Sequence, residues 1–279
     1  MAPPYNMFEN HSGRGAEDSP AAAFHALHSD RETNIWWWRH PLHTDPADLS
    51  LLNTEEFQRA LSLRSEQDAA AYVHIRATTR RAVGELLGVA PEDVEINSPV
   101  CPACDDSRHG QTRIGRPAVP LTISLARTGG HTALAIGTGP AIGIGTEMLR
   151  PVRQDVLREP WLTADEALHL LAIPRGPDRD AHYYRCWTRK EAVLKAMGHG
   201  VRSIRLDQVE SHPGISGTVL MRSPGDSASA YDGWIVRDLK LSDRVAAACA
   251  QPAGTVTAQG PVRLHLPGDT PPEEPPGPW

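Results

Sequence analysis

The fold is decided by a stretch in the second half of the chain, which reads WTRKEAVLKAMG over residues 187–198. Glu191 and Lys195 lie four residues apart and therefore share one face of a helix, while the apolar residues of the stretch cover another face. The same residues also have a structural interpretation, because Thr188 and Glu191 match a capping box and Glu191 with Lys195 makes a helical ion pair of about 0.3–0.5 kcal/mol. Spacing alone therefore predicts a helix and leaves catalysis open.

A second stretch, IGIGTEMLRP at residues 142–151, precedes this helix and predicts a strand ending at an acidic residue, Glu147. Together the two stretches resemble the paired signature of the phosphopantetheinyl transferases, (I/V)-G-(I/V)-D-(I/V)-E-x-x-x-P followed by (F/W)-(S/T/C)-x-K-E-(S/A)-x-x-K. Residues 115–117 (GRP) and 122–126 (TISLA) are similar to two further family motifs, G-(K/R)-P and N-I-S-H-S. The chain is therefore identified as a divergent member of the surfactin-synthetase-associated type, with a resemblance that extends over roughly residues 49–250.

The resemblance implies an activity, cofactors and site residues. The family moves the phosphopantetheine arm of coenzyme A onto a serine of an acyl or peptidyl carrier protein, and it uses magnesium held by carboxylate oxygens. By position, Glu147 and Glu191 would be metal ligands and catalytic residues. Lys195 would be catalytic and would neutralise phosphate charge, and Arg116 and Ser124 would contact coenzyme A with it.

Several positions depart from the family pattern. Gly145 stands where the family has its metal-binding Asp, Leu125 where it has a phosphate-contacting His, and Thr122 where it has Asn. In the weaker N-terminal alignment, Glu56 and Ala71 replace basic residues that meet coenzyme A phosphates. A glycine offers magnesium no side-chain oxygen, and a glutamate repels a phosphate. These changes predict that coenzyme A binding has relaxed or changed.

Three functions follow from this mixture. The first is a repurposed enzyme of polyketide or peptide natural-product biosynthesis that needs no cofactor and acts on a small-molecule intermediate. In it, repulsion between Glu147 and Glu191, together with burial, would raise one pKa and give an acid/base pair for cyclisation or dehydration. The second is a working transferase that uses magnesium and coenzyme A. The third is a non-catalytic module that binds a carrier protein, which the retained charges disfavour.

The order of elements predicts the fold class. Each half reads as a long helix followed by several short strands, which indicates α+β architecture with two similar lobes, each a long helix on a small antiparallel-rich sheet, as in a pseudo-dimer. The predicted lobes are residues 34–140 and 141–253, and the internal pseudo-symmetry favours a monomer. Residues 1–33 are predicted to be a disordered arm and 254–279 a Pro-rich flexible tail.

Periodicity and turn residues place the individual elements. Gly88 is expected to end a helix, and residues 127–130 to make a hairpin turn. The predicted helices are 49–63, 68–87, 163–171 and 181–197. The predicted strands are 35–38, 94–96, 121–124, 132–136, 141–147, 201–209, 217–221, 234–238 and 245–250.

Composition excludes several classes of function. The 279 residues carry a net charge of -6, which argues against a nucleic-acid partner. No apolar run reaches the roughly 20 residues that cross a bilayer, so no membrane association is expected. Four cysteines in a chain of this length do not suggest a disulfide framework, which predicts a cytoplasmic protein.

The remaining cysteines and histidines give weaker signals. Cys101 and Cys104 with His109 could bind zinc, but a fourth ligand is missing and a plain loop is favoured. Cys186 and Cys249 lie among apolar residues and are expected in the core. His131 follows the predicted hairpin turn and is expected at the surface.

Overall fold

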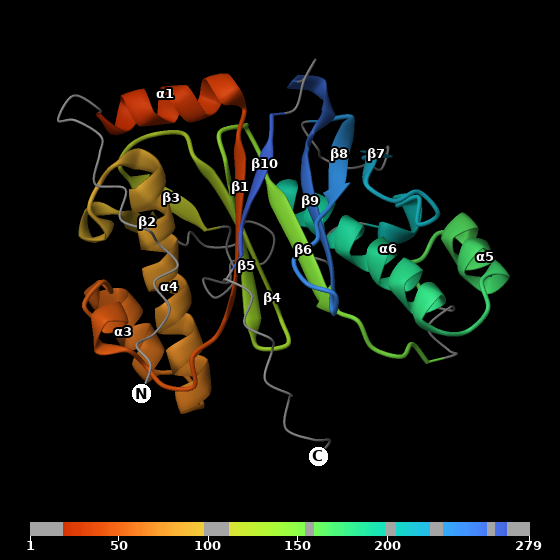
Figure 1. Cartoon of the computed structure of the whole chain (residues 1–279), viewed down its shortest axis with the longest axis horizontal. Coiled ribbons are helices and arrows are strands. Elements are labelled where there is room, and N and C mark those ends of the chain that lie inside the picture. The colour runs from red at the N-terminus through yellow and green to blue at the C-terminus, as the bar shows by residue number, and fades with distance from the viewer. Residues whose placement is uncertain are drawn as a thin grey trace.

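The computed structural model describes residues 19–97, 112–153, 159–198, 205–223, 231–255 and 260–266 (Figure 1). These residues form helices together with two four-stranded sheets and a two-stranded sheet, and the strands of all three sheets are mainly antiparallel. The predicted α+β class is therefore confirmed. The division into two similar lobes stays a prediction.

The first half of the chain builds one sheet and the helices on its outer face. Its elements are α1 (Pro20–Asp30), β1 (Thr33–Arg39), α2 (Pro46–Leu49), α3 (Thr54–Leu61), α4 (Glu66–Leu87), the 3-10 turn η1 (Pro91–Asp93), β2 (Glu95–Asn97), β3 (Arg113–Arg116), β4 (Thr122–Thr128) and β5 (His131–Gly137). The sheet order is β10-β1-β5-β4, and β2 pairs with β3 alone. Gly88 ends α4 in the left-handed conformation, as the sequence predicts.

The second half builds the other four-stranded sheet. Its elements are β6 (Gly143–Met148), α5 (Ala164–Ala172), α6 (Pro177–Ala196), the 3-10 turn η3 (Leu206–Gln208), β7 (Thr218–Arg222), β8 (Gly233–Asp238), β9 (Val245–Pro252), the 3-10 turn η4 (Ala253–Thr255) and β10 (Val262–His265). The sheet order is β6-β9-β8-β7, which leaves β6 at an edge. β10 returns to the first sheet and pairs with β1 in parallel.

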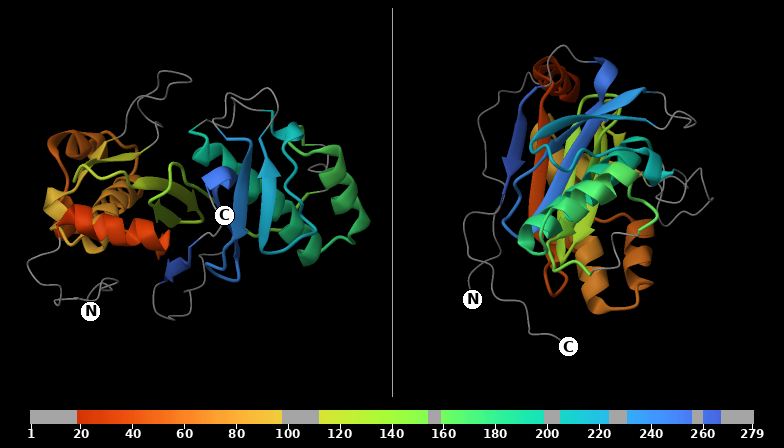
Figure 2. Two further views of the ribbon diagram at one scale, coloured as in Figure 1. Left: turned by 90° about the horizontal axis from the view of Figure 1, so that it is seen from above. Right: turned by 90° about the vertical axis from the view of Figure 1, so that its right-hand side faces the viewer.

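The core lies in three layers between four layers of secondary structure (Figures 1 and 2). Trp36 and Trp38 face α4, while Ile35 and Trp37 alternate to the opposite face of β1 and pack against the second sheet. The far side of the second sheet packs on α6. Both faces of the first sheet are covered, so the side chains of β1 are buried whichever way they point. This explains the run of adjacent tryptophans.

Two segments differ from the sequence expectation because each packs on a distant partner. Within the predicted disordered arm, residues 20–30 form α1, where Ala23 is buried in the core of the first sheet. Within the predicted flexible tail, β10 pairs with β1, and the ring of His265 stacks on Trp36 at 4.3 Å between centroids. Composition indicates mobility in both regions, but contacts with β1 and α4 stabilise these short elements.

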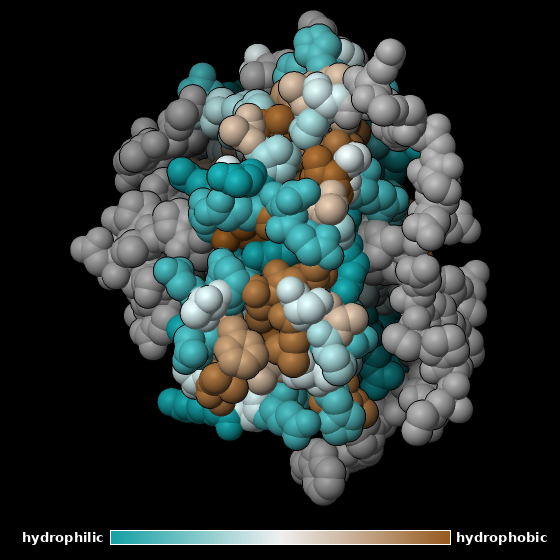
Figure 3. All heavy atoms as spheres, turned by 90° about the vertical axis from the view of Figure 1, so that its left-hand side faces the viewer, coloured by the Kyte–Doolittle hydropathy of each residue, from teal (hydrophilic) through white to brown (hydrophobic). Residues whose placement is uncertain are grey.

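Other boundaries also move. The predicted helix 49–63 is shorter in the structure, because α2 ends at Leu49 and a capping box of Asn53 and Glu56 starts α3 at Thr54. Phe57 and Leu61 of α3 are exposed. Apolar side chains gather in patches on the face that Figure 3 shows. The predicted strand 201–209 contains only a 3-10 turn in its described part, and β3 has no counterpart in the predicted elements.

Three further expectations concern cysteine, zinc and membranes. Cys186 and Cys249 are buried, as predicted, and burial raises the pKa of each thiol to about 12. The zinc candidates Cys101, Cys104 and His109 lie outside the described residues. Within the ranges that the structure describes, no helix is long and apolar enough to cross a membrane.

Candidate functional site

The candidate residues meet where the two sheets come together. β4 is the edge of the first sheet, β6 is the edge of the second, and α6 covers the second sheet beside them. Glu147 lies near the end of β6, Glu191 and Lys195 lie on α6, and Ser124 lies on β4. Arg116 lies on β3 and is exposed.

The edge of β6 is satisfied by side chains instead of by a neighbouring strand. Three alternate backbone N–H groups of β6 donate to oxygens from β4 and α6. Ile144 N donates to Ser124 Oγ (3.1 Å), Thr146 N to Glu191 Oε2 (3.2 Å) and Met148 N to Thr128 Oγ1 (3.0 Å). Buried backbone donors need such partners. Ser124, predicted to bind the cofactor, therefore has a structural role in this structure, and Glu191 has one in addition to its exposed contacts.

Glu147 turns toward the first sheet. Its Oε1 atom accepts a hydrogen bond from Thr128 Oγ1 at 2.8 Å and another from the N–H of Met148 at 3.0 Å. Thr128 thus connects the carboxylate to the edge of β6, since its hydroxyl oxygen also accepts from Met148 N. No motif in the sequence marks Thr128, which is separated from Glu147 by 19 residues.

Glu191 and Lys195 form an ion pair that solvent can reach. Lys195 Nζ lies 2.8 Å from Glu191 Oε1, and the side chains of Lys195 and Glu191 are 29% and 19% exposed. Lys195 Nζ also donates to the backbone carbonyl of Leu125 at 2.9 Å. The side chain at position 125 cannot contact a phosphate, but its carbonyl holds the lysine across the junction. The pair can accept a proton on the carboxylate and neutralise an anion with the ammonium group.

The two carboxylates that the sequence predicts as an acid/base pair have separate hydrogen-bond donors in the structure. Glu147 accepts from Thr128 and Met148, and Glu191 accepts from Thr146 and Lys195. The expected mutual repulsion assumed that the two groups face each other with little positive charge nearby. Instead each carboxylate has donors of its own, and one donor is a lysine.

The negative charge of Glu147 also acts on two tyrosines of α6, Tyr183 and Tyr184. Burial is the largest cause that raises the pKa of Tyr183 and of Tyr184, and the charge of Glu147 contributes to both shifts. These phenols therefore remain protonated and can donate hydrogen bonds at neutral pH. Neither tyrosine was singled out from the sequence, although both lie within one turn of residue 187.

Two charged residues of the WTRKEA motif are structural. Arg189 is fully buried and bonds both oxygens of Asp238 at 2.8 Å, as well as the carbonyls of Ser211, His212 and Ile215. Lys190 is also fully buried, and its Nζ donates to Glu166 (2.6 Å) and to the carbonyls of Trp161 and Leu206. These contacts fasten α6 to α5 and to residues 205–215.

Glu56 has a different role from the one expected. It is buried, and it forms ion pairs with Arg76 and Arg80 of α4 while its backbone and side chain cap α3. Its charge is therefore balanced by two guanidinium groups. Glu56 fixes α3 on α4 and does not present an unbalanced charge to a phosphate.

The residues at the junction do not fit the magnesium site of the predicted family. Among the residues that the structure describes, no group of three His, Cys, Asp or Glu side chains could hold a metal ion. The family's third carboxylate is missing at Gly145, and a Cβ atom there would lie 2.2 Å from the carbonyl oxygen of Thr188. Magnesium requires oxygen ligands in near-octahedral geometry, which two separated carboxylates without the third do not supply.

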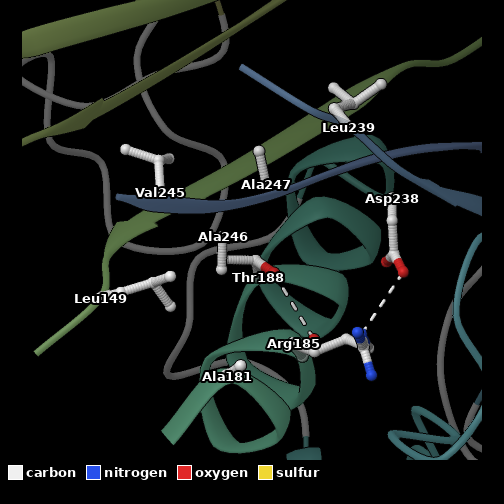
Figure 4. A pocket seen from close by; sticks show the side chains of 9 residues that line it. All are labelled: Leu149, Ala181, Arg185, Thr188, Asp238, Leu239, Val245, Ala246 and Ala247. Atoms are coloured by element: carbon white, nitrogen blue, oxygen red, sulfur yellow. Dashed lines mark hydrogen bonds and ion pairs between the residues drawn. The ribbon is translucent and has the colours of Figure 1, made fainter. Parts of the chain in front are cut away.

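A small cavity lies beside the junction, between α6 and β9 (Figure 4). Its volume is about 160 Å³, and Ala246 on its wall pairs with Glu147 across the β6–β9 register. Arg185 and Asp238 point toward each other at one side, with Nε and Oδ2 3.4 Å apart. Ligand pockets usually measure about 300–1,000 Å³, so this cavity could take a small group but not coenzyme A.

Comparisons with known proteins agree with the motifs. Residues 141–249 match the model of the 4'-phosphopantetheinyl transferase superfamily. The chain is 22% identical over 157 residues to a putative 4'-phosphopantetheinyl transferase of Synechocystis sp.. This alignment covers 56% of this chain and 61% of that protein. It is 26% identical over 180 residues to the 4'-phosphopantetheinyl transferase HetI of Nostoc sp.. This second alignment covers 62% of this chain and 71% of that protein. The first match thus spans less than two thirds of the relative.

Proposed function

We propose that this chain, a member of the 4'-phosphopantetheinyl transferase superfamily whose matching domain spans residues 141–249, transfers the phosphopantetheine arm of coenzyme A to a serine of an acyl or peptidyl carrier protein. Both relatives are described as such transferases. The observation that carries the proposal is the ion pair of Glu191 and Lys195, which is partly exposed at the junction of the two sheets.

The pair has the chemistry that the transfer needs. The serine oxygen would form a bond to the phosphorus next to pantetheine, and the bond from that phosphorus to the bridging oxygen would break and release adenosine 3',5'-bisphosphate. Glu191 would accept the serine proton, and the ammonium group of Lys195 would neutralise charge that develops on the phosphate oxygens. The superfamily generally uses magnesium and coenzyme A, but the described residues supply no three-carboxylate site for the metal.

Intact-mass measurement tests the transfer. The purified protein is incubated with coenzyme A, magnesium and an apo carrier protein, and the carrier is expected to gain the mass of one phosphopantetheine arm. Lys195→Met and Glu191→Gln should each lower the rate by about 10²-fold or more, because each removes one group that acts on the reacting atoms. Lys240→Met is the matched control, since Lys240 forms an exposed surface ion pair with Asp243. A carrier that gains no mass contradicts the proposal.

The closed position at Gly145 favours a second candidate, a repurposed enzyme on the same scaffold. In that case the carboxylates would perform acid/base chemistry, such as cyclisation or dehydration, on a small-molecule intermediate of natural-product biosynthesis. Calorimetry separates the candidates: a transferase binds coenzyme A, whereas the repurposed enzyme shows neither coenzyme A binding nor a mass gain on the carrier. A carrier protein that binds without gaining mass would instead indicate a non-catalytic binding module.

A further inference from the structure

Strand β6 and helix α6 approach each other so closely that two strand positions have no room for a side chain. A Cβ atom on Gly143 would lie 1.9 Å from the carbonyl oxygen of Ala192 and 2.5 Å from the nitrogen of Ala196. A Cβ atom on Gly145 would lie 2.2 Å from the carbonyl oxygen of Thr188. Every one of these atoms is helix backbone, which cannot rotate aside as a side chain can.

Buried charges hold α6 in this position. Arg189 is bound to Asp238 and to the 211–215 segment, and Lys190 is bound to Glu166 and to two backbone carbonyls. A shift of α6 away from β6 by more than a few tenths of an ångström would stretch these bonds. Broken buried ion pairs leave uncompensated charges, so the position of the helix is strongly specified.

The carboxylates that remain near β6 are engaged with the protein. Glu147 accepts from Thr128 and from its own neighbour Met148, and Glu191 accepts from Thr146 and from Lys195. Lys195 Nζ lies 2.8 Å from the carboxylate of Glu191 and so places a positive charge directly beside it. A divalent cation would have to compete with this lysine for the same carboxylate.

We propose that the contact between β6 and α6 has closed the strand side of this site, so that the site binds no divalent cation and Lys195 is its resident positive charge. An aspartate cannot be restored at position 145 without displacing α6. The inference concerns the same junction as the proposed transfer, but it does not depend on that transfer, because metal binding is measured without coenzyme A or a carrier protein.

Titration with Mn²⁺ tests the proposal directly. Electron paramagnetic resonance measures free Mn²⁺ while the full chain is added, and we expect the free signal to stay unchanged. Saturable binding of one Mn²⁺ per chain that disappears in both Glu147→Gln and Glu191→Gln would overturn the proposal. Binding that persists in both variants places the ion elsewhere on the chain and agrees with a closed site.

Glycine variants test the contact itself. Gly145→Ala should lower the melting temperature by roughly 4–10 °C, as expected for overpacking in a chain of this size. Gly139→Ala is the control, because a Cβ atom there has no neighbour within 4 Å, and it should leave the melting temperature unchanged. A Gly145→Asp variant that is as stable as the wild type and gains Mn²⁺ binding would overturn the proposal. If both Gly145 variants fail to fold while Gly139→Ala folds, the closed contact is supported.

Discussion

Lys190 lies one residue from a candidate catalytic glutamate, yet it has a structural partner of its own. Its ammonium group and the carboxylate of Glu166 are both fully buried and 2.6 Å apart. Glu166 also accepts from Ser211 and caps the start of α5 through Thr163. A single ion pair therefore joins α5, α6 and the 206–211 segment.

Substitution of Lys190 by Met should destabilise the protein strongly. The change leaves Glu166 buried without its cation, and removal of one partner of a buried pair costs about 3–5 kcal/mol. The double variant Lys190→Met with Glu166→Gln should lose less than the two single losses combined, because neither charge then remains. Urea unfolding followed by circular dichroism measures both quantities. A loss below about 1 kcal/mol for Lys190→Met would show that the pair contributes little.

His40 gives the protein a defined response to acid. Its pKa is lowered to about 4 by burial and by the charges of Arg127, His131 and His74, while the ring accepts or donates a hydrogen bond with Thr132 Oγ1 at 2.6 Å. In the unfolded chain the same group has the ordinary pKa of 6.5. The unfolded state therefore binds more protons than the folded state between these values, and the free energy of unfolding falls as the pH drops from 6.5 toward 4.

The variant His40→Gln should remove part of this acid sensitivity. Glutamine can keep a hydrogen bond to Thr132 but has no proton to gain, so urea midpoints at pH 7 and pH 5 should differ less than they do in the wild type. Burial also lowers the pKa of His131, His182 and His265, which act in the same direction and leave some dependence in place. An unchanged difference between pH 7 and pH 5 would contradict the role of His40.

At the scale of elements, the residue types of a segment predict those strands, turns and helices that are stabilised by contacts within the segment. The tryptophans at 36–38 predict a strand because aromatic side chains fit a pleated surface, and Gly129 and Gly130 predict the hairpin because both adopt positive φ. Helix α1 also carries local signals, since Ser19 caps it and Pro20 occupies its first turn. These signals could have corrected the expectation of a disordered arm.

The candidate site is likewise predictable from the sequence only in part. The resemblance to the family predicts that Glu147, Glu191 and Lys195 share one site, because they stand at matching positions of a strand and a helix. The ion-pair partners of Arg189 and Lys190 lie 49 and 24 residues away in the sequence, and only the folded chain brings them together. The loss of the ligand at Gly145 is visible in the sequence, whereas the closure of α6 over it depends on a backbone distance that no residue pattern encodes.

At the scale of the whole molecule, the two sheets pack face to face, and their edge strands β4 and β6 lie side by side without pairing their backbones. β4 belongs to one sheet and β6 to the other, and side chains from β4 and α6 satisfy the N–H groups along β6. The candidate site is built on this seam, the contact of β4 with β6 and α6. The carboxylate of Glu191 therefore serves both the joint between the sheets and the ion pair with Lys195, which connects any chemistry at the site to the stability of the seam.

Removal of a hydroxyl group from β4 should destabilise the contact between β4 and β6 more than the hydrogen-bonded pairing within either sheet. Ser124→Ala leaves the buried N–H of Ile144 without its acceptor, which should lower the free energy of unfolding by about 1–3 kcal/mol. Hydrogen exchange should accelerate first at the amide of Ile144, because this part of the edge strand loses its acceptor and opens locally. Ser62→Ala is the control, since that hydroxyl donates to an exposed helix end. If the Ile144 amide keeps its wild-type exchange rate in Ser124→Ala, the seam is held by apolar packing between the sheets and not by these hydroxyls.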